Sequence, residues 1–377
     1  MAERDKRVER EKREQRNARG WIGRALPLAL AVVAVLALVL YVLDRIPFAP
    51  GPGGANPLRV EKGELPLVVP HGGAKRLYPE NTILSYRMMA ERGWTNFEID
   101  LALSADGVLV SHHDLSIKAT TGEDRPVREL SYAELTTRNF GVNFTSPDGS
   151  RPYADTAALA RDDPALLAEL APARLDALFA AYPEASYILE LKDTFERTGA
   201  ANATAAAEAL AREIDSAGVR DRVVVASFED ASTAALRAAS GGSIATAAAS
   251  DEVLVFAVLS ALGLDFFLKP GYSALLLPIE DRIKPKQRAL VEKLPAFLRD
   301  KLAWYDPERD EWYTRLVDRR IVEDARRHGV AVHYWTVNDE ETMRELVALG
   351  VDGIITDRPD LLEKVYAELG AERAARP

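Results

Sequence analysis

Short runs of β-forming residues alternate with helical stretches along about 300 residues of this 377-residue chain, and no other feature restricts its fold so strongly. The β-forming runs are 67–69, 96–100, 108–110, 187–190, 223–226, 265–268, 330–333 and 353–355. Helical patterns lie between them, over about 81–92, 203–216 and 340–349. Strands that alternate with helices form parallel sheets, and this number of strands favours a closed sheet. The pattern predicts a parallel α/β fold of the TIM-like (β/α)8 barrel type.

Two stretches exceed what a minimal barrel requires. Residues 136–172 carry Asn, Ser, Pro and Asp at short intervals and predict a long loop with a short helix. Residues 270–320 combine leucines at 275–277 and several basic residues with the aromatic residues Trp304, Tyr305, Trp312 and Tyr313. This composition is typical of a helical insertion packed on a barrel. It also fits a surface that rests on a membrane or covers an active site, and the sequence leaves both interpretations open.

An apolar run of nineteen residues without a charge, 25–43, precedes the barrel pattern. At about 1.5 Å per residue, a helix of this length spans the roughly 30 Å hydrocarbon core of a bilayer. A cleaved signal peptide is the alternative. Its apolar region usually has about 7–15 residues and ends at a small-x-small site, which residues 41–45 do not provide. The run therefore predicts a single N-terminal transmembrane helix that stays in the protein.

Charges on either side of this run predict its orientation. Residues 1–24 hold nine basic and five acidic residues, whereas the rest of the chain has an excess of fourteen acidic residues. Because basic flanks stay in the cytoplasm, we expect 1–24 to form a basic cytoplasmic tail. The Pro- and Gly-rich residues 44–57 are expected to form a linker. Residues 58–377 then form a barrel domain on the periplasmic or extracellular side of the cell membrane.

Two features of the composition exclude whole classes of function. The chain contains no cysteine, which rules out thiolate nucleophiles, disulfides, zinc–thiolate sites and iron–sulfur clusters. The acidic body is a poor match for a phosphate backbone, and we expect no nucleic-acid partner. Any catalysis must therefore use oxygen and imidazole groups.

Polar side chains close several of the predicted strands. In a parallel barrel the reacting groups lie at the carboxyl ends of the strands, where such side chains meet. The candidates are His71 before two glycines, Glu98 and Asp100 on one strand, Glu190 and Lys192 on another, and the run His112-His113-Asp114. Neighbouring residues of a strand face opposite sides, so we expect only one of the two adjacent histidines to reach the centre.

Three carboxylates without sulfur describe a site for a hard divalent cation, Ca²⁺ or Mg²⁺. Two imidazoles beside such a cation supply an acid and a base for displacement at phosphorus. Each group has an ordinary structural alternative, such as a solvated strand face for Glu98 and Asp100 or a rim ion pair for Glu190 and Lys192. The joint occurrence of residue types that one metal–phosphate site uses favours the catalytic interpretation.

Several segments of the chain resemble the glycerophosphodiester phosphodiesterase family. They are HGGAKRLYPENT at 71–82, FEIDLALSADGVLVSHHD at 97–114, ILELK at 188–192, ASF at 226–228, WTVN at 335–338 and VDGIITDRP at 351–359. They occur in the family's order within about 66–365. The resemblance implies a TIM-like barrel that hydrolyses small glycerophosphodiesters to glycerol phosphate and an alcohol.

The resemblance also implies roles for individual residues. The implied ligands of a divalent metal are Glu98, Asp100 and Glu190, and the implied acid/base pair is His71 and His113. Lys192 is expected to hold a phosphoryl oxygen, and Trp335 to form an apolar wall for the glycerol. In the family, a neighbouring hydroxyl of the substrate attacks phosphorus, and water then opens the cyclic phosphate.

The chain departs from the family pattern at two positions. The family usually has an Arg directly after the first histidine, where it binds phosphate, and this chain has Gly72. Lys75 or Arg76 could reach in from the same loop instead. Ala119 stands where the family often has a second Arg. Both departures concern the choice of substrate more than metal binding.

The sequence thus predicts a membrane-anchored, extracytoplasmic, metal-dependent phosphodiesterase. Two alternatives stay open. One is phospholipase D-like hydrolysis of phospholipids or lysophospholipids, which the membrane tether and residues 270–320 favour because they could lift a headgroup from the bilayer. The other is a non-catalytic barrel that keeps its metal and binds a phospho-ligand, which Gly72 suggests.

Overall fold

The computed structural model of the protein describes residues 56–374, together with residues 35, 39 and 42. The expected cytoplasmic tail 1–24, most of the expected transmembrane helix 25–43 and most of the linker 44–57 lie outside these residues. Among the residues that are described, no helix combines the length and the apolar character needed to cross a bilayer.

Ten strands are formed by the described part of the chain. They are β1 (Leu67–Pro70), β2 (Asn96–Leu103), β3 (Leu109–Ser111), β4 (Ser186–Leu191), β5 (Val223–Ala226), β6 (Ala274–Pro278), β7 (Ala303–Asp306), β8 (Glu311–Thr314), β9 (Ala331–Trp335) and β10 (Gly353–Thr356). Two parallel arrays, β2-β4-β5 and β6-β9-β10-β1, form most of a ring.

The two arrays are joined into a barrel at two places. Residues 245–247 lie between β5 and β6, with parallel bridges from Thr246 to Val225 and from Ala247 to Ala274. On the other side, the Asn96 side chain at the start of β2 donates a hydrogen bond of 3.2 Å to the Val68 carbonyl of β1. The ring therefore has the eight parallel positions of a TIM-like barrel, as predicted, with one position reduced to a short segment.

Two of the eight predicted strands do not belong to this ring. The run 108–110 forms β3, which pairs antiparallel with the outer part of β2. The run 265–268 is not a strand, because Asp265–Phe267 form a 3₁₀ turn in which Phe267 is 71% exposed. The missing positions are filled by 245–247 and by β6, which the sequence analysis assigned to an insertion.

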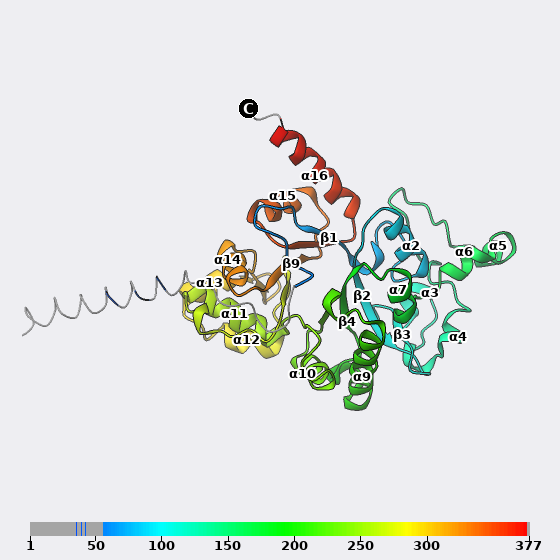
Figure 1. Ribbon diagram of the computed structural model, residues 1–377, viewed down its shortest axis with the longest axis horizontal. Coiled ribbons are helices and arrows are strands. Elements are labelled where there is room, and N and C mark those ends of the chain that lie inside the picture. Colours follow the sequence, from blue (N-terminus) through cyan, green and yellow to red (C-terminus); the bar gives the residue numbers. More distant parts are fainter. Residues whose placement is uncertain (1–34, 36–38, 40–41, 43–55, 375–377) are drawn as a thin grey trace, which may run out of the picture.

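Helices cover the outside of the barrel. They are α2 (Ile83–Glu91), α3 (Lys118–Thr121), α4 (Tyr132–Leu135), α5 (Thr156–Asp162), α6 (Pro164–Glu169), α7 (Leu175–Ala181), α8 (Phe195–Thr198), α9 (Ala200–Ala217), α10 (Asp230–Ala239), α11 (Ser250–Leu262), α12 (Pro285–Val291), α13 (Ala296–Leu302), α14 (Arg319–Arg327), α15 (Glu340–Leu349) and α16 (Pro359–Ala374). In Figure 1, α11, α12 and α13 lie at one side of the molecule and α5 and α6 at the opposite side.

The ends of these helices follow from short-range sequence signals. Thr82 and Ser85 form a reciprocal capping box at the start of α2, so the helix begins directly after the loop that carries His71. The Asp339 side chain caps α15 by accepting a hydrogen bond from Thr342 N. At the C-terminal end of α9, Gly218 adopts a φ of +69° and ends the helix before β5.

The interior of the barrel is filled mostly by small side chains. Val69, Ile188, Ala226, Ala247, Ala274, Ala331 and Ile355 point inward from seven ring positions and form one buried cluster. Alanine at four of these positions leaves room above the cluster. A cavity at the carboxyl ends of the strands begins there.

The two predicted insertions have more regular structure than expected. Residues 136–172 contain two short helices, α5 and α6, each begun by an aspartate that caps it. The stretch 270–320 first supplies β6 to the ring and then leaves the barrel as α12, α13 and the β7–β8 hairpin. The insertion proper therefore starts after Pro278, nine residues later than predicted.

The described chain begins at the amino ends of the strands. The Asn56 side chain donates hydrogen bonds of 2.6 and 3.3 Å to the carbonyls of Ser273 and Gly329. Ser273 lies just before β6, and Gly329 lies just before β9. Leu58 is buried beneath the barrel interior, and its carbonyl accepts a hydrogen bond from His333 Nε2. Residues 56–58 thus close the barrel at the end opposite to the cavity.

Candidate active site

A cavity of about 330 Å³ lies at the carboxyl ends of the ring strands. Its charged side is lined by five predicted site residues, which we call the charged wall: His71, Glu98, His113, Glu190 and Lys192. They come from β2, from the end of β4 and from the segments that follow β1 and β3. Residues separated by more than 100 positions in the chain therefore meet at one place.

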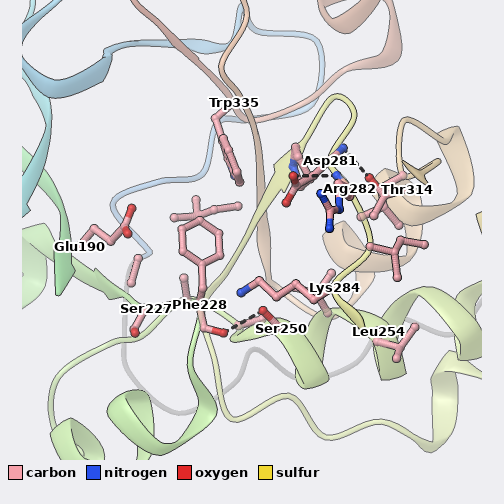
Figure 2. Close-up of a pocket in the computed structure, with 18 of the residues that line it drawn as sticks. Glu190, Ser227, Phe228, Ser250, Leu254, Asp281, Arg282, Lys284, Thr314 and Trp335 are labelled. Atoms are coloured by element: carbon pink, nitrogen blue, oxygen red, sulfur yellow. Dashed lines mark hydrogen bonds between the residues drawn. The ribbon is translucent and has the colours of Figure 1, made fainter. Parts of the chain in front are cut away.

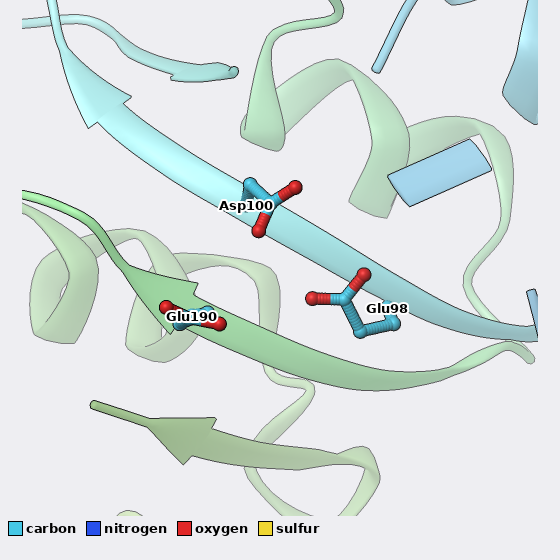
Figure 3. A group of neighbouring side chains, drawn as sticks. All are labelled: Glu98, Asp100 and Glu190. Carbon is cyan, nitrogen blue, oxygen red and sulfur yellow. The ribbon is translucent and has the colours of Figure 1, made fainter. Parts of the chain in front are cut away.

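Three carboxylates form a compact cluster in the charged wall and beneath it. Glu98 and Asp100 project from the same side of β2, and Glu190 projects from the neighbouring β4, where its Cα is the register partner of Asp100 (Figure 3). One oxygen from each of the three lies within 4.8 Å of the others. Glu98 and Asp100 are buried, so their charges need compensation.

Two lysines supply part of that compensation. Lys192 Nζ lies 2.6 Å from Glu190 Oε1 and 2.9 Å from Asp100 Oδ1. Lys75 Nζ lies 3.5 Å from both Asp100 Oδ2 and Glu80 Oε2. For each lysine, burial acts to lower the pKa, but the neighbouring carboxylates outweigh it and the net shift is upward. Both lysines are therefore ammonium ions.

Burial affects the two carboxyls of β2 in different ways. It raises the pKa of Glu98 to about 7, and repulsion from Asp100 adds to this shift. Burial also acts to raise the pKa of Asp100, but Lys192 and Lys75 outweigh it and the pKa of Asp100 is well below its usual range. Glu98 is therefore the carboxylate that two lysines leave incompletely neutralised.

The donor set fits a hard divalent cation. All three groups are carboxylates, which suit Ca²⁺ or Mg²⁺. Asp100 Oδ1 is buried and, although it lies near Lys192, receives no hydrogen bond of good geometry among the described residues. Glu98 uses one oxygen to accept a 2.7 Å hydrogen bond from Gly72 N. The other carboxylate oxygens of the cluster are available as ligands. A pKa raised by burial and by a neighbouring carboxylate, as that of Glu98 is, is typical of an acidic cluster that binds a positive charge.

His71 is oriented by an aspartate that the sequence analysis did not assign. Its Nδ1 lies 2.8 Å from Asp357 Oδ1, directly after β10. Asp357 is itself fixed by Asn338, whose Nδ2 donates a 2.8 Å hydrogen bond to Oδ2 and whose Oδ1 accepts one from Asp357 N. Burial acts to lower the pKa of His71, but Asp357, Glu98 and Asp100 outweigh it and raise the pKa overall. Nδ1 is therefore used for positioning, and Nε2 is the nitrogen available to a substrate.

The two adjacent histidines have different surroundings. His113 lines the cavity with a side chain that is 43% exposed, and its Nδ1 lies 2.9 Å from Asp114 Oδ1. His112 is buried against Phe140 and lies near Thr120 Oγ1 and the Asp114 carbonyl. Burial lowers the pKa of His112, which keeps it neutral. Of the pair, only His113 lines the cavity.

The Lys75 side chain lies in the space that a side chain at position 72 would fill. Gly72 has a φ of +50°, and a Cβ added to it would lie 2.2 Å from Lys75 Cε. The Lys75 side chain therefore crosses the face of Gly72 on its way to Asp100 and Glu80. Arg76 points elsewhere, with a side chain that is 59% exposed and Nε 3.7 Å from Asp357 Oδ2. Neither Lys75 nor Arg76 lines the cavity itself.

Two aromatic rings stand in the middle of the cavity. Trp335 at the end of β9 and Phe228 after β5 meet edge to face, with ring centroids 5.4 Å apart. In Figure 2, Glu190 lies on one side of this pair, and Leu254 and Thr314 lie on the other. The pair therefore divides the cavity into a charged part and a second part lined by other elements.

Three residues near the site were not singled out by the sequence analysis. Asp357 follows an apolar strand run, as the predicted site residues do, and this signal could have found it. Asn81 donates a 3.0 Å hydrogen bond to Asp100 Oδ2 and has a φ of +56°, which no sequence signal indicates. Phe228 belongs to the quoted segment ASF, where an aromatic residue after a strand is the only indication.

A closed parallel barrel with an acidic cluster and two imidazoles at its carboxyl ends defines a TIM-barrel-like hydrolase suited to phosphate esters. The Glycerophosphoryl diester phosphodiesterase family matches residues 71–361, and the chain belongs to this family. Its membership confirms the prediction of a phosphoric diester hydrolase.

The alignment with each of two curated relatives covers nearly the whole length of the relative. The Glycerophosphodiester phosphodiesterase of Caldanaerobacter subterraneus subsp. tengcongensis is 24% identical over 299 residues, which cover 78% of this chain and 96% of the relative. That of Bacillus subtilis (strain 168) is 25% identical over 336 residues, which cover 88% and 97%.

Solved structures share the fold. The glycerophosphoryl diester phosphodiesterase domain of a Mycobacterium tuberculosis protein superposes with a TM-score of 0.61 at 19% identity, over 81% of this chain and 100% of that one. A phosphodiesterase from Oleispira antarctica, solved with its product sn-glycerol-3-phosphate, superposes with a TM-score of 0.52 at 20% identity, over 80% and 97%. At these identities the likeness supports the barrel fold alone.

Proposed function

We propose that the protein hydrolyses glycerophosphodiesters to glycerol phosphate and an alcohol, with a divalent cation on Glu98, Asp100 and Glu190. The observation that carries this proposal is the meeting of Glu98 and Glu190 with His71, His113 and Lys192 in one cavity, with Asp100 buried within 4.8 Å of both carboxylates. When bound, the cation supplies Lewis-acid stabilisation of charge on the phosphoryl oxygens. The three carboxylates suit Ca²⁺ and Mg²⁺ alike.

The residues of the chain itself then divide the remaining work. His71, held through Nδ1 by Asp357, exchanges a proton through Nε2, and His113 exchanges the second proton from a more exposed position. One imidazole deprotonates the attacking hydroxyl, and the other protonates the departing alcohol. Lys192 holds a phosphoryl oxygen, and Trp335 gives the glycerol a flat apolar wall.

Lys75 compensates only indirectly for the family's arginine in this proposal, because it contacts Asp100 and does not line the cavity where a phosphate would bind. Its ammonium is positioned at Asp100 by the space that Gly72 leaves, whereas Arg76 is exposed and points at Asp357. Lys75 supports the charged wall from behind Asp100 and raises the positive potential that a phosphate meets.

The test uses the purified full-length chain in mild detergent. We expect release of choline from glycerophosphocholine with added Ca²⁺ or Mg²⁺, and loss of this activity with a chelator and in His113→Ala. If the wild type releases no alcohol from any glycerophosphodiester while Ca²⁺ or Mg²⁺ still raises its melting temperature, the protein is a binding barrel and the proposal is wrong.

We further propose that residues 25–43 anchor the protein in the cell membrane, with residues 1–24 in the cytoplasm and the barrel in the periplasm or outside the cell. The charge-free apolar run and the basic residues before it support this topology. A periplasm-dependent reporter fused after residue 377 should be active, and deletion of 25–43 should release the barrel from the membrane fraction. Activity of a cytoplasm-dependent reporter would contradict the topology.

A further inference from the structure

The cavity continues well beyond the charged wall. Past Phe228 and Trp335 it is lined by apolar side chains from β6, α11, α12 and the segment after α12. We call these residues the apolar chamber: Val253, Leu254, Ala257, Leu276, Val291 and Leu294. Figure 2 shows Leu254 of α11 pointing into this part of the cavity. The chamber and the charged wall belong to one continuous cavity.

Three charged residues of this second part lie at its rim. Asp281 and Arg282 are exposed, and they are bonded among themselves and to Thr314: Arg282 N donates to Asp281 Oδ1 at 2.8 Å, and Asp281 N donates to Thr314 Oγ1 at 3.0 Å. Lys284 is also exposed, and its Nζ lies 5.9 Å from the centroid of the Phe228 ring. These charged groups therefore face solvent, while the six residues of the chamber have hydrocarbon side chains.

A small glycerophosphodiester does not use such a chamber. Each carbon of its glycerol carries an oxygen, and these oxygens find no hydrogen-bond partner among the leucines and valines. A hydrocarbon chain gains affinity there with each methylene that leaves water. Two of its six residues, Val291 and Leu294, come from α12 and the segment after it, which belong to an insertion that the barrel does not need for closure.

We propose that the apolar chamber holds the acyl chain of a single-chain glycerophospholipid, so that a lysophospholipid is the substrate class of this site. The inference rests on the proposed function and deepens it. With the phosphodiester at the charged wall and the glycerol at Trp335, the chain passes Phe228 and enters the chamber. The P–O bond to the headgroup alcohol breaks, water supplies the new oxygen on phosphorus and the proton of the alcohol, and acylglycerol phosphate remains.

A chain-length series tests the chamber directly. Lysophosphatidylcholines with butanoyl, hexanoyl and octanoyl chains are offered to the full-length holoenzyme below their micelle-forming concentrations, beside glycerophosphocholine. We expect kcat/KM to rise about fivefold to tenfold for every two methylenes, mostly through KM. A flat series with active glycerophosphocholine hydrolysis would overturn the inference and leave the proposed function intact.

Two substitutions on one helix provide a matched comparison. Leu254→Trp fills the chamber, whereas Val255→Trp places the same ring on the exposed face of α11, where Val255 is 50% exposed. We expect Leu254→Trp to lower the ratio of kcat/KM for the octanoyl substrate to that for glycerophosphocholine at least tenfold. Val255→Trp should leave the ratio within about twofold of the wild type. Leu294→Trp, on the facing segment, should repeat the effect of Leu254→Trp, and equal ratios in all variants would contradict the chamber.

A binding measurement keeps the inference separate from catalysis. Calorimetry with n-octylphosphocholine, again below its micelle-forming concentration, reports binding without turnover. Binding to the wild type that Leu254→Trp weakens tenfold supports the chamber even if no diester is hydrolysed, in which case only the proposed function fails. No binding to the wild type, or equal binding to both proteins, would overturn the inference.

Discussion

The charged wall and the apolar chamber share one cavity but are built in opposite ways. In the charged wall, His71 is fixed by Asp357, Glu98 by Gly72 N and Lys192 by two carboxylates. In the apolar chamber, side chains from β6, α11 and α12 are placed by packing alone. Replacement of a single atom in the charged wall should therefore abolish activity. Binding in the chamber should change only when the volume of a side chain changes.

Asp100→Asn gives the largest expected effect. It keeps the shape of a buried side chain but removes the charge to which Lys192, Lys75 and the proposed cation respond. We expect kcat/KM for glycerophosphocholine to fall by about 10³-fold or more, together with loss of the rise in melting temperature on adding Ca²⁺ or Mg²⁺. Asp360→Asn is the control, because its carboxylate pairs with Arg358 outside the cavity. Substantial activity of Asp100→Asn would mean that the carboxylates are structural.

Asp357→Asn is expected to have a smaller effect. It weakens a charge-assisted hydrogen bond to His71, so we expect kcat to fall about tenfold to a hundredfold with little change in KM. Because Asp357 raises the pKa of His71, the limb of the pH–rate profile that belongs to His71 should move to lower pH. A uniform loss of rate at unchanged pH dependence would point to a merely structural role.

A double-mutant cycle tests whether Gly72 and Lys75 act together. Gly72→Ala places a Cβ 2.2 Å from Lys75 Cε and must displace that side chain. We expect Lys75→Ala to lower kcat/KM about tenfold, and Gly72→Ala to add little in the Lys75→Ala background. Gly93→Ala is the control, since Gly93 also has a positive φ, +80°, but has no atom within 4 Å of an added Cβ. Additive losses of kcat/KM would show that Gly72 and Lys75 act independently.

The smallest effect concerns the pH dependence of cation binding. Burial and Asp100 raise the pKa of Glu98 to about 7, and a cation binds only the ionised carboxylate. Below that pH a proton competes, so the affinity for Ca²⁺ or Mg²⁺ should fall by up to about tenfold per pH unit between pH 7 and 6 and level off at higher pH. Titration calorimetry at pH 6, 7 and 8 measures this. Constant affinity over the range would show that Glu98 is ionised throughout.

The charged wall was easier to predict from the sequence than the chamber. Glu98, Asp100, Glu190 and Lys192 stand at i, i+2 spacings on apolar strands, and the strand period places them on one side. Asp357 escaped assignment because a single aspartate after a strand is more often a cap or turn residue.

The chamber depends on tertiary context. The run Ala274–Pro278 contains three leucines and a proline, which do not favour a strand, yet it pairs with β9 along its whole length. The run 265–268 shows the opposite error. Its two phenylalanines predict a strand, but the chain forms a turn at the surface there. Whether each run forms a strand is determined by packing against elements that are distant in the sequence. The residues of the run itself do not indicate this packing.

The chain enters the folded body at Asn56, on the amino-end side of the strands, while the cavity opens at the carboxyl-end side. With the anchor proposed for residues 25–43, the point of attachment lies at the end of the barrel opposite to the opening. An opening turned away from the bilayer would receive a lipid only after that lipid has desorbed. One acyl chain holds a molecule in a bilayer only weakly and reversibly, whereas two hold it firmly. Such an orientation would select monomers in solution and spare the intact membrane to which the enzyme itself is attached.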